Sequence, residues 1–304
     1  MNEKNRNPLI CDPESGICEV PELSNQTDND LRKADGKRLR MVYFTDPICS
    51  SCWGIEAQLK KLKLEFGHEL DIEYRMGGLL PDWSYNSGGI SKPADVAAHW
   101  DEVSLHYQMP IDGDVWIEDP LHSSYPPSIA FKAAQLQDLD KAQRFFRILR
   151  EMVFVRKINI AKWENLAAVA ALAGLNVDRL KTDFEGRGKE LFDQDLEMAA
   201  KMGVRGFPTI FIVSSEGNSE KIYGVKSYTE YEEAITHMEP GVVKMDYDKA
   251  WENLFARFRS LTLKEFAELS EISSSSAEVL LTRLTKEGKL SVFDTKNGSI
   301  WSFL

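Results

Sequence analysis

All four cysteines of this 304-residue chain lie within its first 52 residues. They form two pairs, Cys11 with Cys18 and Cys49 with Cys52. A pair that cycles between dithiol and disulfide needs one ionised, accessible thiol and a second thiol close enough to resolve the mixed disulfide. Two serines separate Cys49 from Cys52, so the two sulfurs are one turn apart if a helix begins there. The second pair therefore predicts thiol–disulfide exchange.

The residues around this pair predict a strand followed directly by a helix. Residues 41–44 are a continuous apolar run, as in a strand buried on both faces. Beyond it, one apolar stripe at helical spacing contains Cys52, Ile55, Leu59, Leu62 and Phe66. Unpaired amides and the macrodipole at the helix start favour a thiolate at Cys49. Cys52, on the buried stripe, suits a protected resolving thiol.

These cysteines could have two other roles, as core residues or as zinc ligands. Free cysteines are often small buried core residues, but two of them seldom fall at the first turn after a buried strand. A zinc site made by Cys11, Cys18, Cys49 and Cys52 is the second alternative. The six residues between Cys11 and Cys18 exceed the usual spacing of about two to four in such sites.

The rest of the chain divides into an arm, a main domain and a small module. Residues 1–37 are polar and acidic, which predicts a flexible arm with one short turn over residues 12–16. Residues 38–240 read as an α/β domain, in which a mostly helical insert of about 90–200 separates a β–α–β unit from two further strands, 209–213 and 221–225.

Residues 241–304 predict a helix–turn–helix–hairpin module, the outline of a winged helix. The helices are expected over 261–269 and 277–286, and the hairpin turns at Asn297-Gly298. The module has nine basic and nine acidic residues, so it lacks the basic face that DNA phosphates require. Docking of a protein partner, or dimerisation, fits it better than nucleic-acid binding.

Whole-chain composition narrows the functional classes further. The formal net charge of −11 disfavours nucleic acid as the main partner, and no apolar run has the roughly 18 residues of a membrane span. The first residues contain no apolar core of a secretory signal, so a cytoplasmic location is expected. In that reducing compartment four clustered cysteines favour redox chemistry over structural disulfides. We expect no bound cofactor and no resident metal.

The stretches TDPICSSCWGIEAQLKKL and GVRGFPTIFIV, either side of the helical insert, resemble the DsbA-like branch of the thioredoxin superfamily. The resemblance covers about residues 38–240 and is closest to cytosolic members of the FrnE and SpxH kind. It implies a thioredoxin-like fold in which Cys49 is the nucleophile and Cys52 resolves. It further implies a cis bond before Pro208 that leaves the Phe207 backbone free to pair with an extended substrate. Trp53 is expected to wall this substrate site.

Departures from the family pattern bear on the activity. Periplasmic oxidases of the family have a histidine where this chain has Ser51, which weakens the case for a strong oxidant. Glutathione-dependent isomerase relatives replace the first cysteine with serine, whereas this chain retains Cys49.

The sequence is compatible with two functions. The favoured one is a thiol–disulfide oxidoreductase that exchanges with protein dithiols, protein disulfides or glutathione. The alternative is a DsbA-like adaptor of the SpxH kind, which binds a client and a protease and uses its thiols only to sense redox state. Cys11 and Cys18 are an accessory redox pair that exchanges with Cys49 and Cys52, bystanders in a disordered tail, or a handle for a soft metal.

Overall fold

The computed structural model describes residues 11–12, 16–19, 37–84 and 92–304. A four-stranded sheet in the order β4-β3-β6-β7 forms its centre. The strands are β3 (Leu39–Thr45), β4 (Leu70–Met76), β6 (Thr209–Ser214) and β7 (Ser219–Tyr223). β3 is parallel to β4 and antiparallel to β6, so it is flanked on both sides. This interior position explains the unbroken apolar run in its sequence.

The helix after β3 is divided into α1 (Ser50–Gly54) and α2 (Glu56–Phe66). The expectation of one continuous helix is wrong at Ile55, which has φ −100° and ψ 9°. Just before this break Gly54 packs closely against the insert, since an added Cβ there would lie 2.7 Å from the ring of Tyr107. The insert therefore presses directly on the first turn after the cysteines, a contact that local periodicity cannot reveal.

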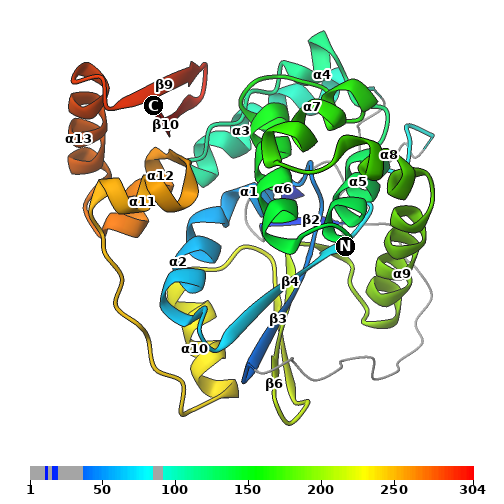
Figure 1. The fold of residues 1–304 in the computed structure, drawn as a ribbon, viewed down its shortest axis with the longest axis horizontal. Helices are drawn as coiled ribbons and strands as arrows, with labels where there is room; N and C mark the ends of the chain where they lie inside the picture. The colour runs from blue at the N-terminus through cyan, green and yellow to red at the C-terminus, as the bar shows by residue number, and fades with distance from the viewer. Residues whose placement is uncertain (1–10, 13–15, 20–36, 85–91) are drawn as a thin grey trace, which may run out of the picture.

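The insert is helical, as predicted, and it shares one core with the sheet. Its helices are α3 (Ala94–Tyr107), α4 (Val115–Glu118), α5 (Tyr125–Gln135), α6 (Leu139–Phe154), α7 (Trp163–Ala173), α8 (Val177–Glu185) and α9 (Arg187–Lys201). Tyr74 of β4 packs edge-to-face against Phe131 of α5 and Phe146 of α6. Figure 1 shows α5 to α9 gathered on one side of the strands, and α10 (Tyr228–Met238) beside α2.

The N-terminal arm contributes strands, which the sequence did not predict. β1 (Cys11–Asp12), β2 (Ile17–Glu19) and β5 (Gly206–Phe207) form a three-stranded antiparallel sheet in the order β1-β2-β5. The expectation of a flexible arm is therefore wrong for residues 16–19, because β5 supplies a pairing partner almost 190 residues away in sequence. Residues 13–15 of the predicted turn, and the arm segments 1–10 and 20–36, lie outside the described residues.

The C-terminal residues form a unit with a core of its own. Its elements are α11 (Trp251–Phe258), β8 (Ser260–Thr262), α12 (Leu263–Ser270), α13 (Ser274–Lys286), β9 (Leu290–Thr295) and β10 (Gly298–Phe303). The two helices and the hairpin of the predicted module are present, and the strands are ordered β8-β10-β9. α11 and β8 were not predicted. Among the described residues, none of the helices combines the length and apolar character that a membrane span requires.

Candidate functional site

Cys49 and Cys52 lie at the junction between β3 and α1, and both are free thiols. Cys49 occupies the N-cap position, and the backbone amide of Cys52 donates a hydrogen bond to Cys49 Sγ over 3.1 Å. The turn is closed by Cys49 N, which donates to the Asp46 carbonyl oxygen at 3.2 Å. The two thiols therefore have the arrangement expected of a nucleophile and a resolving thiol.

Both thiols are completely buried, and the hydrogen bond between them decides which one ionises more readily. Burial raises the pKa of Cys49 well above its ordinary value, although the Cys52 amide and the charge of Arg150 act in the opposite direction. For Cys52, burial is outweighed by the hydrogen bond from Cys49 and by Arg150, so its pKa is lowered. The predicted preference for a thiolate at Cys49 does not hold in this arrangement, because both sulfurs are equally buried and the hydrogen bond that Cys49 donates to Cys52 favours the charged form of Cys52.

The sulfur of a third cysteine contacts Cys49. Cys18 of β2 is fully buried and disulfide-bonded, and its Sγ lies 3.5 Å from Cys49 Sγ. It also lies 3.5 Å from the hydroxyl oxygen of Ser51. The arm strand therefore covers the first turn of α1 and brings a disulfide sulfur into contact with the thiol at the N-cap.

β5 holds this arm strand in place. Cys18 pairs with Phe207 in the antiparallel register, and the peptide bond between Phe207 and Pro208 is cis. The backbone that the family resemblance reserves for an extended substrate is thus occupied by the chain's own residues. The assignment of Phe207 and Pro208 to substrate binding stays a prediction.

Ser51 and Trp53 attach the first turn of α1 to the insert. The hydroxyl groups of Ser51 and Tyr107 are hydrogen-bonded at 2.8 Å. The indole Nε1 of Trp53 donates to the Pro110 carbonyl oxygen at 3.1 Å, and its ring stacks on Phe154. Trp53 is fully buried, so in this structure it anchors the insert, and its predicted contact with substrate stays a prediction.

Arg150 of α6 supplies the positive charge nearest the thiols. Its side chain is fully buried, and its guanidinium donates to Glu56 Oε1 at 2.6 Å, to Thr45 Oγ1 at 2.6 Å and to the Asp46 carbonyl oxygen at 3.2 Å. These bonds hold the guanidinium against the end of β3. Its charge acts to lower the pKa of both Cys49 and Cys52.

The Asp46 carboxylate joins the loop before Cys49 to two other segments. It accepts hydrogen bonds from the amides of Ile48 and Leu79, at 3.1 and 2.8 Å, and from the Ser124 hydroxyl at 2.9 Å. Burial nevertheless raises the pKa of Asp46 to about 6. The side chain is therefore more than the turn residue that its place before a proline suggests, because it titrates near neutral pH.

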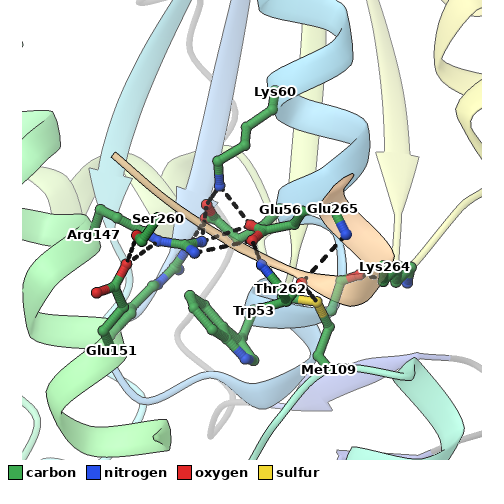
Figure 2. Close-up of polar contacts among 12 residues, drawn as sticks. Trp53, Glu56, Lys60, Met109, Arg147, Glu151, Ser260, Thr262, Lys264 and Glu265 are labelled. Carbon is green, nitrogen blue, oxygen red and sulfur yellow. Dashed lines mark hydrogen bonds and ion pairs between the residues drawn. The ribbon is translucent and has the colours of Figure 1, made fainter. Parts of the chain in front are cut away.

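A buried ion-pair network joins this region to the C-terminal module (Figure 2). Glu265 of α12 accepts hydrogen bonds from Lys60 Nζ at 2.6 Å and from Arg147 Nη1 and Nη2 at 2.6 and 2.9 Å. Glu56 then pairs with Lys60 at 2.9 Å and with Arg150 at 2.6 Å. Burial acts to raise the pKa of Glu265, but Arg147 and Lys60 outweigh it and bring the pKa to about 2.

Two further contacts fix the module over α1. Lys264 Nζ donates to the carbonyl oxygens of Gly54 and Tyr107, at 2.9 and 3.0 Å. The guanidinium of Arg147 lies 4.4 Å from the Trp53 ring centroid, so one cation contacts both the network and the first turn of α1. A continuous set of polar contacts thus links the module to the thiols through Glu56 and Arg150.

The sequence had signals for some of these residues. Arg150 stands between Phe146 and Phe154 at spacings of four, so a charge occurs within an apolar helical face. Thr262 and Glu265 match a capping box, and the structure has both of its hydrogen bonds. Neither signal identifies the residues with which Arg150 and Glu265 form ion pairs, because those residues lie on elements distant in sequence.

The structure brings Cys18 into contact with Cys49, and it pairs the backbones of Cys11 and Cys18. Within the part of the chain that the structure describes, no cluster of three or more histidine, cysteine or acidic residues has the geometry to hold a metal ion.

Comparison with known proteins assigns the family. The sequence profile of a family described as thioredoxin matches residues 43–233. A protein of Halalkalibacterium halodurans named ClpXP adapter protein SpxH is 32% identical, with 98% of each chain covered. This chain belongs to the SpxH family, within the DsbA-like thioredoxin superfamily.

Other relatives agree with this family assignment. The Shouchella clausii protein named ClpXP adapter protein SpxH is 31% identical over the whole of both chains. Among solved structures, the cytosolic disulfide reductase DsbM from Pseudomonas aeruginosa aligns with a TM-score of 0.52 at 19% identity. That alignment covers 66% of this chain and 97% of DsbM, so it supports the fold. The SpxH relatives extend over the C-terminal module as well.

Proposed function

We propose that this protein is an adaptor that binds a client protein and promotes its degradation by ClpXP, with Cys49 and Cys52 as a redox-responsive element. Two SpxH relatives that match at least 98% of this chain carry the name of a ClpXP adapter. The structural observation that supports the proposal most is the complete burial of Cys49 beneath Cys18. A thiol enclosed by its own chain suits a regulated binding protein better than an enzyme of high turnover.

The C-terminal module is proposed to be winged-helix-like and to contact a protein partner. Its zero net charge disfavours nucleic acid, and side chains such as Val279 and Leu304 are more than 70% exposed. Its attachment through Glu265 gives the module a fixed orientation on the thioredoxin-like domain. A bound partner would therefore contact a surface that is coupled, through Arg147 and Glu56, to the thiol site.

The test is reconstituted proteolysis. Proteins retained by the immobilised full chain are identified, and each is incubated with ClpXP, with or without substoichiometric amounts of this protein. We expect at least one retained protein to be degraded many-fold faster when the adaptor is present. Val279→Asp should weaken retention if the module contacts the partner, and Glu278→Gln on the same helix is the matched control. Unchanged degradation of every retained protein would refute the adaptor assignment.

A second candidate, a thiol–disulfide oxidoreductase, is supported by the free thiol pair at the helix N-terminus. Its test is turnover of a low-molecular-weight disulfide in the presence of reduced glutathione. Turnover that is abolished by Cys49→Ser, together with mixed disulfides trapped by Cys52→Ser, would establish the enzyme. Proteolysis that persists in both variants would assign the thiols to regulation.

A further inference from the structure

The structure holds the two reactants of a thiol–disulfide exchange in contact. Cys18 belongs to a disulfide, Cys49 is a free thiol, and their sulfurs are 3.5 Å apart. Cys52 lies one helical turn later and would resolve a mixed disulfide. Its backbone amide donates a hydrogen bond to Cys49 Sγ. Each component of the exchange is therefore supplied by this chain.

The arm strand β2 packs closely against β5. A Cβ added to Gly206 would lie 2.5 Å from Ile17 Cγ2 and 2.7 Å from the Cys18 carbonyl oxygen. At the other end of the strand, the amide of Val225 donates to the Gly16 carbonyl oxygen at 3.2 Å. Gly16 has φ +65°, and a Cβ there would lie 2.6 Å from Val225 Cβ. Glycine at both positions lets residues 16–19 pack this closely against β5 and Val225.

We infer that the N-terminal strand is a built-in substrate of the Cys49–Cys52 pair, with a Cys11–Cys18 disulfide as the group that exchanges. The backbones of Cys11 and Cys18 are paired directly across the antiparallel register. Paired residues in such strands have Cα atoms about 4.5–5.5 Å apart, within the range that a disulfide bridges. The inference rests on the redox response proposed above and identifies what the thiols respond to.

The exchange is balanced within the chain. The Cys49 thiol first loses its proton; its sulfur then attacks Cys18 Sγ, a Cys18–Cys49 bond forms, and the Cys11–Cys18 bond breaks. The Cys11 sulfur leaves with the electron pair and takes up a proton. The Cys52 thiolate then attacks Cys49 Sγ, and Cys18 leaves as a thiolate that is protonated in turn. Two protons are released and two are taken up, so the oxidation passes from the arm to the Cys49–Cys52 pair without another reactant.

The exchange also decides whether the site is covered. While the arm disulfide is intact, it ties β2, the strand that lies over Cys49, to β1, because a cross-link reduces the freedom of the released segment. After the exchange the arm carries two thiols and loses this constraint. A partner with an extended segment can then compete for the Phe207 backbone. The arm thus couples its own redox state to access at the site.

The test traps the intermediate in the full chain. Cys52→Ser protein is oxidised to one disulfide per molecule, freed of oxidant, incubated without oxygen, quenched with acid and alkylated. Peptide mapping without reductant then identifies the bridge. We expect a Cys18–Cys49 bridge with a free Cys11 thiol, in exchange with the Cys11–Cys18 bridge. Cys52→Ala serves as a second background, and wild type should contain both Cys11–Cys18 and Cys49–Cys52 bridges.

A matched control tests whether the bridge to Cys49 depends on the position of Cys18 against Cys49 or only on having another cysteine in the same chain. In Cys18→Ser/Cys52→Ser protein, only Cys11 can reach Cys49 along the arm, so the bridge to Cys49 should form at least about tenfold less, which corresponds to about 1.4 kcal/mol. Equal yields in the two proteins would overturn the inference, as would a Cys11–Cys18 bridge that never exchanges. If Cys49 and Cys52 still titrate with glutathione in that case, the proposed redox response stands. If they do not titrate, that response fails too.

Discussion

Neutralising Glu265 tests whether the buried network holds the C-terminal module on the thioredoxin-like domain. Glu265→Gln preserves the shape of the side chain but removes the charge that pairs with Arg147 and Lys60. The lowering of its pKa from 4.5 to about 2 corresponds to about 3 kcal/mol, at about 1.4 kcal/mol per pH unit. Removing one member of a fully buried ion pair typically costs about 3–5 kcal/mol, which agrees with that figure.

The assay is urea denaturation at pH 7, with the change in the free energy of unfolding as the readout. Glu265→Gln should lower it by about 3 kcal/mol. Glu268→Gln is the matched control on the same helix, because Glu268 is 37% exposed and its contact with Lys61 is 3.9 Å long. Such surface pairs contribute about 0–1 kcal/mol. A loss below about 1 kcal/mol for Glu265→Gln would show that the Glu265 ion pairs do not hold the module in place.

The pH dependence gives an independent check of the same residue. The folded-state pKa of Glu265 is below its unfolded value, so its contribution is fully present above the unfolded pKa of about 4.5. The contribution is lost as the pH falls through the folded value of about 2. Wild type should therefore lose stability more steeply than Glu265→Gln between these pH values. Parallel curves would contradict the assignment.

Three further outcomes follow from the site. Arg150→Met should raise the pKa of Cys52, because the guanidinium charge lowers it, and titration of thiolate absorbance measures the change. The same variant should lose about 3–5 kcal/mol of stability, because Glu56 loses a buried partner. The pKa of Asp46 is raised from 3.8 to about 6, so wild type should lose about 3 kcal/mol of stability as the pH rises between these values. Asp46→Asn should abolish that loss in denaturation curves at pH 4 and 7.

The central strand and its helix could be predicted from the sequence because their signals are local. The apolar run of β3 indicates a strand buried on both faces. The apolar stripe of α2 indicates a helix buried on one face. The place of Cys49 at a helix start follows from the same pattern. Contacts between distant segments are invisible to such patterns, as the close packing of the Tyr107 ring against Gly54 demonstrates.

The covering of Cys49 is the most consequential feature that the sequence could not reveal. Residues 16–19 have too few apolar residues to predict a strand, and their pairing depends on Gly206 and Phe207. The same limit applies to Glu265, whose capping role is local but whose charge is satisfied by helices α2 and α6. Helix α11 is different, because Trp251, Leu254, Phe255 and Phe258 follow a helical spacing that was readable.

The most direct test of this account is the rate at which an alkylating reagent modifies Cys49 in the native full chain. Gly206→Ala should displace the arm, since its Cβ would overlap the Cys18 carbonyl oxygen, and overpacking of this kind costs about 1–3 kcal/mol. Gly241→Ala is the control, because an added Cβ there has only ordinary contacts, the nearest at 3.6 Å. We predict that Cys49 reacts at least about tenfold faster in Gly206→Ala than in wild type or Gly241→Ala, which corresponds to about 1.4 kcal/mol of lost docking. Equal rates in all three proteins would contradict the claim that the arm covers the site.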